Sequence, residues 1–330
     1  DHIDVPKPYT ELNEGAVADY HATASVGVIA SQDNGYGTTG IVPQAQIGFL
    51  RWGTNGLIQM AERLEAGDVI QVGVQYGYDS LPGAGCTSSC KMPMEYNIAI
   101  RDTFTYLTEE KGIHVVLAAA NGNINLDHAW FEGYFDPDRF DSGAIYAGAV
   151  EPQTGRRRYS SQYGHRVNLF SWGANVTSTT HSAANPTTGY THTYSGTSSA
   201  NPIIAGVVAS LQGVARAKGL GNIPPKQLRE YLVATGYPPV NGNRTEIGVQ
   251  PDLEAAIKKM LDEHANLPPT GRLALPETAQ SEQTFSARVY AESPSQKPLT
   301  YAWNATGFTP ATGSEETLIL QAPSVTVDTV

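Results

Sequence analysis

The chain has 330 residues, 40% of them hydrophobic and 16% charged, a composition typical of a folded protein with a substantial core rather than of a disordered one. Its formal net charge of −11 at pH 7 argues against nucleic acid or an anionic membrane surface as the main partner. No apolar run approaches the roughly 20 residues that a membrane-spanning helix needs.

Helix-like and strand-like segments alternate between residues 21 and 262. Helical spacing is found in six segments: 21–31, 56–66, 94–111, 200–218, 225–235 and 253–263. Pro202 is compatible with the fourth of these because it lies in the first turn of that segment. Short apolar runs predict three buried strands, at 69–74, 113–120 and 144–150. Strands separated by helices of this length predict an α/β domain over residues 1–265, with a mostly parallel sheet and helices on both faces.

The composition changes at a Pro/Gly-rich linker, residues 266–271, and a second domain is expected over 266–330. Alternating residues at 284–291, 299–303 and 316–321 predict half-buried strands of a β-sandwich. The segment is shorter than the roughly 100 residues typical of such a sandwich. We interpret it as the front part of an immunoglobulin-like or PKD-like accessory domain, whose partner the sequence does not indicate.

The two cysteines, Cys86 and Cys90, lie in a short stretch rich in turn-forming residues. This setting favours a disulfide within one loop over two free thiols. Two cysteines cannot complete a structural zinc site by themselves, and no nearby histidine has the usual spacing. The low Lys content and the many Tyr, Thr, Gly and Asn residues are also typical of extracellular proteins, so we expect the protein to be secreted.

Three polar residues stand at positions where catalytic groups are often found. Ser198 lies at the start of a helix, where the positive end of the helix dipole stabilises developing negative charge. His21 opens an apolar helix, and Asn121 follows a buried strand, at the edge where parallel sheets bind ligands. Taken singly, each has an ordinary structural explanation: a serine cap, a surface or capping histidine, and an Asn-Gly turn.

Taken in chain order, the segments around these residues resemble the boxes of the subtilisin-like serine peptidases, the subtilase family. The family boxes are His-Gly-Thr-x-x-Ala-Gly, Ala-Gly-Asn and Gly-Thr-Ser-x-Ala-x-Pro. Here they read His21-Ala-Thr-Ala-Ser-Val-Gly27, Ala119-Ala-Asn121 and Gly196-Thr-Ser-Ser-Ala-Asn-Pro202. Further matches lie at 40–45, 144–150, 159–164 and 172–178, so that the resemblance covers roughly residues 2–262.

The resemblance implies a secreted serine endopeptidase with a subtilisin-like fold, which acts on protein or peptide substrates and requires no cofactor for its chemistry. Ser198 Oγ would attack the scissile carbonyl, and His21 would take the hydroxyl proton and return it to the leaving amine. The Asn121 side-chain amide and the Ser198 backbone N–H would bind the oxyanion.

The resemblance also implies that two chain segments line the substrate pocket. They are Gly73, Val74 and Gln75 on one wall, and Ala118, Ala119 and Ala120 on the other. Gln75 stands where the family usually has glycine, so the depth and preference of the pocket are expected to differ. The other departures are small and remove no catalytic group: Ala22, Val26, Ala120 and Ser199-Ala-Asn201.

A catalytic aspartate is expected upstream of Asp1. In the family this aspartate ends a core strand a few residues before a His-Pro-Asp-Leu segment, which His2-Ile-Asp4-Val5 resembles. Asp1, Asp4 and Asp19 are within reach of His21 by sequence, but none of them follows an apolar strand. On this interpretation the 330 residues contain no carboxylate that binds His21 Nδ1.

Structural calcium is a further expectation raised by the resemblance, since family members often bind it. The candidate ligands are Asp127, Asp136, Asp138 and Asp141, but their irregular spacing favours a solvated acidic loop. The alternative to an enzyme is a catalytically silent subtilisin fold that serves as a binding or adhesion module. The altered small residues and the accessory sandwich favour that alternative, whereas the intact Ser198, His21 and Asn121 oppose it.

Overall fold

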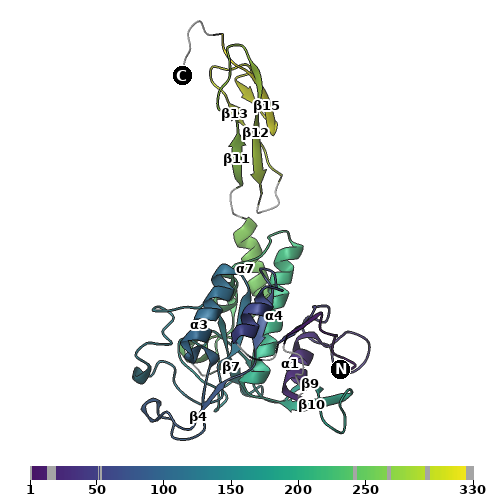
Figure 1. Cartoon of the computed structure of the whole chain (residues 1–330), viewed down its shortest axis with the longest axis vertical. Helices are drawn as coiled ribbons and strands as arrows, with labels where there is room; N and C mark the ends of the chain where they lie inside the picture. Colours follow the sequence, from purple (N-terminus) through teal and green to yellow (C-terminus); the bar gives the residue numbers. More distant parts are fainter. Residues whose placement is uncertain are drawn as a thin grey trace. The chain divides into compact units, whose positions relative to one another are not determined.

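The computed structural model describes residues 2–12, 20–50, 52, 54–240, 244–265, 269–293 and 298–324. The chain forms two compact units, Asp1–Lys259 and Met260–Val330, which we describe separately (Figure 1). The sequence predicted a boundary after residue 265. The division between the two units falls earlier, between Lys259 and Met260, inside helix α7 (Leu253–Ala265).

The core of the first unit is a parallel four-stranded sheet in the order β3 (Val69–Val72), β6 (His114–Ala118), β7 (Ile145–Val150) and β8 (Leu169–Trp172). The three strands expected from apolar runs are confirmed, and β8 is an addition. Every residue of β6 and β7 is buried, as expected for a parallel sheet covered on both faces.

Helices cover both faces of this sheet, which confirms the predicted α/β architecture. Helix α4 (Thr197–Ala217) packs against all four strands through a buried stripe at helical spacing that includes Ile204, Val208 and Leu211. On the other face, Phe104 of helix α3 (Ile98–Thr105) shares a core with Leu117 of β6. Figure 1 shows α3 and α4 on different sides of β7.

The prediction that Pro202 lies in the first turn of its helix is wrong. Helix α4 begins at Thr197, which places Pro202 in the second turn. Proline has no N–H, so the carbonyl of Ser198, four residues earlier, loses its usual donor within the helix. Tyr194 supplies the missing donor, because its Oη donates to the Ser198 carbonyl oxygen at 2.8 Å.

The long helix expected at 94–111 is built from three consecutive pieces. They are the 3₁₀ turn η2 (Met94–Tyr96), helix α3 and the π-helical turn η3 (Tyr106–Glu110). Asn97 separates the first two, because its side-chain Oδ1 caps α3 by accepting from the N–H groups of Ala99 and Ile100. Gly112 ends the segment as expected, with a φ of +65° in the left-handed region that favours glycine.

Helix α1 (Tyr20–Ala30), expected at 21–31, packs against α4 and against the antiparallel pair β9 (Val176–Thr180) and β10 (Gly189–Tyr194). Gly27 allows the close approach, since a methyl group there would stand 2.2 Å from Thr179 Oγ1. The first unit also contains β1 (Thr10–Leu12), β2 (Gly48–Leu50), α2 (Thr54–Ala61), η1 (Pro82–Ala84), η4 (Ala129–Phe131), α5 (Pro225–Thr235) and α6 (Arg244–Ile247). Among the described residues, no helix is long and apolar enough to cross a membrane.

The two cysteines form the predicted disulfide, Cys86–Cys90. Cys90 is the first residue of β5 (Cys90–Met92), which pairs antiparallel with β4 (Tyr76–Tyr78). This cross-linked hairpin begins directly after Gln75, so it continues the chain from the segment expected to line the substrate pocket.

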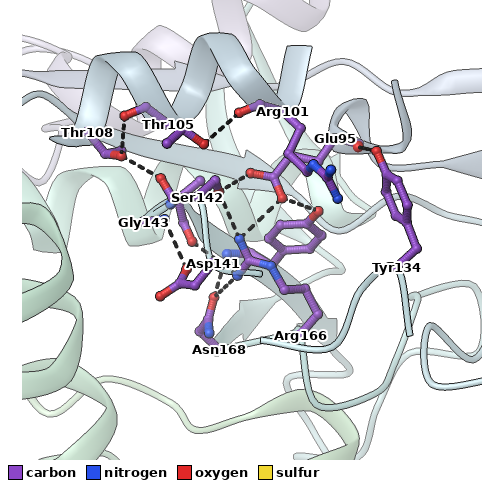
Figure 2. A network of polar contacts seen from close by, with 12 residues as sticks. Glu95, Arg101, Thr105, Thr108, Tyr134, Asp141, Ser142, Gly143, Arg166 and Asn168 are labelled. Carbon is purple, nitrogen blue, oxygen red and sulfur yellow. Dashed lines mark hydrogen bonds and ion pairs between the residues drawn. The ribbon is translucent and has the colours of Figure 1, made fainter. Parts of the chain in front are cut away.

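A buried polar network lies beside α3 (Figure 2). The carboxylate of Glu95 lies 3.2 Å from the Arg166 guanidinium and accepts hydrogen bonds from the hydroxyl groups of Ser142 and Tyr146. Both charged side chains are only 2–3% exposed. The Arg166 guanidinium also donates to Asn168 Oδ1 at 3.1 Å and lies over the Tyr146 ring, so the buried charges have several polar partners.

The second unit contains two antiparallel sheets. One has the order β11 (Thr270–Ala274), β12 (Thr284–Glu292) and β15 (Thr317–Gln321), and the other pairs β13 (Trp303–Asn304) with β14 (Thr312–Gly313). Two boundaries differ from expectation, because residues 270 and 271 of the expected linker begin β11 and only residue 303 of the expected strand 299–303 is extended in a sheet. Likeness to an immunoglobulin-like or PKD-like domain stays a prediction.

His114, at the start of β6, is expected to make the protein less stable in mild acid. Burial lowers the pKa of its imidazole from 6.5 to about 4, although the hydrogen bond to Gln212 Oε1 at 3.2 Å opposes this shift. Between these values the unfolded chain binds a proton that the folded chain rejects. This contribution to the free energy of unfolding is therefore complete above pH 6.5 and is lost as the pH falls towards 4. The loss should reach about 3 kcal/mol.

Urea unfolding of the parent and of His114→Leu, at several pH values from 7.5 to 4, measures this contribution. The variant should lose part of the acid sensitivity, whereas replacement of the exposed His192 by Gln should leave it as in the parent. Identical pH dependence of the parent and His114→Leu would show that His114 does not carry the effect.

Candidate active site

Ser198 lies at the start of α4. It is partly exposed, whereas its neighbours Thr197 and Ser199 are buried. The helix is preceded by Gly196, whose φ of +86° turns the chain into the first helical residue. Ser199 fixes this turn to the sheet, since its hydroxyl donates to the carbonyl of Trp172, the last residue of β8. The serine is thus held at the positive end of a long helix dipole.

Tyr194 connects Ser198 with His21. Its ring packs edge-on against the His21 imidazole, with ring centroids 5.7 Å apart, while its hydroxyl donates to the Ser198 carbonyl oxygen. The hydroxyl of Ser25, one turn along α1 from His21, donates to the same tyrosine oxygen at 2.7 Å. The start of α1 and the start of α4 are therefore brought together, as the order of the sequence motifs implied.

Gly73, directly after β3, lies against His21. A methyl group on Gly73 would stand 3.4 Å from His21 Cε1 and 2.9 Å from Gln71 Nε2. The first distance allows a carbon atom, whereas the second is too short, so an alanine there would displace the end of the Gln71 side chain. The end of β3 thus lies beside the imidazole.

Asn121 is held between α4 and the segment that follows β3. Its Oδ1 accepts from the Thr197 backbone N–H at 3.0 Å. Its own backbone N–H and its Nδ2 donate to Gln75 Oε1, at 2.9 and 3.3 Å. Ala120, just before it, has a φ of +79°, in the left-handed region where the glycine of the family motif costs less than alanine.

The loop after Asn121 depends on a side chain that the sequence motifs did not single out. The Oε1 of buried Gln162 accepts from the backbone N–H groups of Gly122 and Ile124, at 3.2 and 2.7 Å. Its Nε2 donates to the Lys91 carbonyl at 2.7 Å, which fixes the disulfide hairpin to the same loop. In the sequence, the only indication of a role for Gln162 was its place in segment 159–164, which resembles the family.

The six residues expected to line the substrate pocket differ in exposure. Val74 is 38% exposed, and Gly73 and Gln75 are partly exposed. Ala118, Ala119 and Ala120 are at most 2% exposed as whole residues, so neither their side chains nor their backbone is open to a substrate in this structure. One segment follows β3 and the other begins with the last residue of the neighbouring parallel strand β6, and Gln75 is hydrogen-bonded to Asn121, the residue after Ala120.

Of the three aspartates within reach of His21 by sequence, Asp1 and Asp19 lie outside the described residues. Asp4 is fully buried, and its carboxylate accepts from the Thr38 backbone N–H at 2.8 Å and from Asn34 Nδ2 at 3.1 Å. It also accepts from the Tyr190 hydroxyl, and burial together with this neighbouring carboxylate raises the pKa of Tyr190 to about 12. Asp4 thus anchors the 34–38 loop.

The candidate calcium ligands are engaged with separate partners. Asp127 accepts from His165, and Asp141 is paired with Arg229. Burial raises the pKa of the Asp141 carboxyl, but the hydrogen bonds and charge of Arg229 outweigh this effect and hold it well below its usual range. In the part of the chain that the structure describes, no group of three or more His, Cys, Asp or Glu side chains is placed to hold a metal ion.

Comparison with known proteins agrees with this geometry. The sequence model of the Subtilase family matches residues 3–264. The chain belongs to the subtilase family. A subtilisin-like serine protease of Penicillium rubens, Pen ch 18, is 32% identical over 142 residues, which make up 42% of this chain and 26% of that protein. Cur l 4.0101, a subtilisin-like serine protease of Cochliobolus lunatus, is 31% identical over 131 residues, 38% of this chain and 24% of that protein.

This subtilase therefore spans about a quarter of the length of the curated relatives it matches.

Solved structures show the same fold. A protease of Pseudoalteromonas arctica gives a TM-score of 0.53 at 23% identity, over 72% of this chain and 70% of its own. Fervidolysin from Fervidobacterium pennivorans, a keratinolytic enzyme related to subtilisin, gives 0.52 at 21% identity, over 82% of this chain and 38% of its own.

Proposed function

We propose that this subtilase is a secreted serine endopeptidase in which Ser198 is the nucleophile and His21 the general base. The observation that carries the proposal is the contact through Tyr194, which packs against the His21 ring and hydrogen-bonds to Ser198. Both residues thus contact one tyrosine, and acyl transfer requires a histidine near a serine nucleophile. Protein or peptide chains are the proposed substrates, and the disulfide Cys86–Cys90 supports an extracellular location.

In the proposed reaction, Ser198 Oγ attacks the scissile carbonyl carbon while His21 takes the hydroxyl proton. The tetrahedral oxyanion is stabilised by the Ser198 N–H and by Asn121 Nδ2. His21 then gives its proton to the leaving amine, which departs and leaves an acyl-enzyme. Water, deprotonated by His21, hydrolyses the acyl-enzyme and restores Ser198. The mechanism also needs a carboxylate that orients His21 by accepting a hydrogen bond from Nδ1.

Covalent labelling with a fluorophosphonate probe tests the proposal. Such probes react with an activated serine hydroxyl, so the natural full-length protein should give one adduct, on the peptide that contains Ser198. Heat-denatured protein should give none, because the activation depends on the fold. The control variant is Ser195→Ala. Ser195 lies three residues from Ser198 and its hydroxyl donates to the Thr193 carbonyl, so this variant should still be labelled. No adduct, or an adduct on another serine, would contradict the proposal and favour a silent binding module.

A further inference from the structure

Gln75 is a departure from the subtilase pattern whose side chain contacts Asn121, the proposed oxyanion donor. Its side chain reaches from the segment after β3 to the residue after β6, where its Oε1 accepts two hydrogen bonds from Asn121. One comes from the backbone N–H at 2.9 Å and the other from Nδ2 at 3.3 Å. The role inferred below rests on the proposed function, since it concerns the same reaction.

The backbone fixes the orientation of both side-chain amides. The Asn121 N–H can only donate, so the atom of Gln75 that meets it is the carbonyl oxygen. The Thr197 N–H can likewise only donate, so the atom of Asn121 that meets it is Oδ1. Asn121 Nδ2 then lies on the side of Gln75 Oε1. A flipped Asn121 amide would place oxygen against oxygen at Gln75 and N–H against N–H at Thr197.

We propose that Gln75 is a positioning residue for catalysis, which holds the Asn121 amide with its donor end available to the oxyanion. An amide nitrogen has two protons, and Gln75 engages one of them while the other serves the oxyanion. Preorganised donors stabilise a transition state without reorganisation during the reaction, so fixing this amide should act on kcat more than on KM. A glycine at position 75 has no side chain to supply this contact.

Two substitutions of similar size separate the parts of this role. Gln75→Met removes the acceptor, and kcat should fall about tenfold with KM changed by less than about twofold, the loss expected for one hydrogen bond. Gln75→Glu keeps an acceptor but adds a carboxylate close to the developing oxyanion. Repulsion between the two negative charges should lower kcat by about a hundredfold at pH 8. The ratio of variant to parent kcat should rise towards one as the pH is lowered and the carboxylate is protonated.

The kinetics are measured on the natural full-length protein with a peptide substrate, together with the rate of fluorophosphonate labelling. The matched control is Gln227→Met. Gln227 lies on α5, where its side chain donates to the Tyr231 hydroxyl, so this variant should keep the parent kcat. Should Gln75→Met fail to fold, the pH-dependent ratio of the Gln75→Glu variant decides alone.

An increase in kcat on Gln75→Met would overturn the inference, because it would mean that the side chain obstructs the site. A change confined to KM, or a pH-independent ratio for Gln75→Glu, would also overturn it. In these cases the parent is active and labelled at Ser198, so the proposed function stands. A parent that is neither active nor labelled overturns the proposed function, and this inference with it.

Discussion

Ser198→Ala is expected to lower kcat by about 10⁶, which leaves no measurable proteolysis, while the protein stays folded. The magnitude is that of subtilisin itself, in which loss of the serine alone costs about 2 × 10⁶ in kcat. The fold should tolerate the change because the Ser198 atom that accepts from Tyr194 is the carbonyl oxygen, which alanine retains. Hydrolysis of a chromogenic peptide and the urea unfolding midpoint, both measured on the natural full-length protein, check the two halves of this expectation.

Ser210→Ala is the matched control for this variant. Ser210 lies on the same helix, and its hydroxyl donates to the Gly206 carbonyl, so its loss should leave kcat within about twofold of the parent. Residual activity of Ser198→Ala within tenfold of the parent would mean that another residue is the nucleophile. If neither the parent nor the variant hydrolyses any peptide, the silent binding module becomes the better reading of the fold.

The sequence predicted the elements whose apolar pattern is local. Strands β6 and β7 are mostly apolar runs, and α5 has the bounds that its proline start and helical spacing indicated. Strand β8 was not predicted because it has only four residues and includes Ser171, so no period is visible. Strands β9 and β10 are rich in threonine; β9 packs against α1, which is distant in sequence, and β10 pairs with β9.

The residues of the site that could be predicted from the sequence are those that lie in contiguous motifs. Ser198, His21 and Asn121 each sit in such a motif, and the contacts described above join the segments that carry them. Gln75 acts through Asn121, and Tyr194 contacts His21 and Ser25, which are all partners far along the chain that no local pattern reveals. The Pro202 error has a different origin, because its donor is close in sequence but lies outside the helix. A proline in the second turn is acceptable only if an outside donor serves the freed carbonyl, and in this fold Tyr194 is that donor.

Glu95→Ala is expected to have the largest effect on stability, because it breaks a buried ion pair from one side. Arg166 would remain fully charged and buried without its carboxylate, and the Ser142 and Tyr146 hydroxyl groups would lose their acceptor (Figure 2). Removing one partner of such a pair typically costs about 3–5 kcal/mol, far more than the pair itself contributes relative to apolar residues. The free energy of unfolding, measured in urea and compared at constant m-value, should fall by this amount.

Two further variants distinguish burial of charge from the mere loss of a glutamate. Glu109 pairs with Lys226 at the surface, where the side chains are 45% and 44% exposed, so Glu109→Ala should cost less than about 1 kcal/mol. The double substitution Glu95→Leu/Arg166→Met leaves no unpaired charge and should recover much of the stability lost by Glu95→Ala. A cost of Glu95→Ala below about 1 kcal/mol, or a double variant no more stable than the single one, would show that the unpaired charge of Arg166 is not the cause.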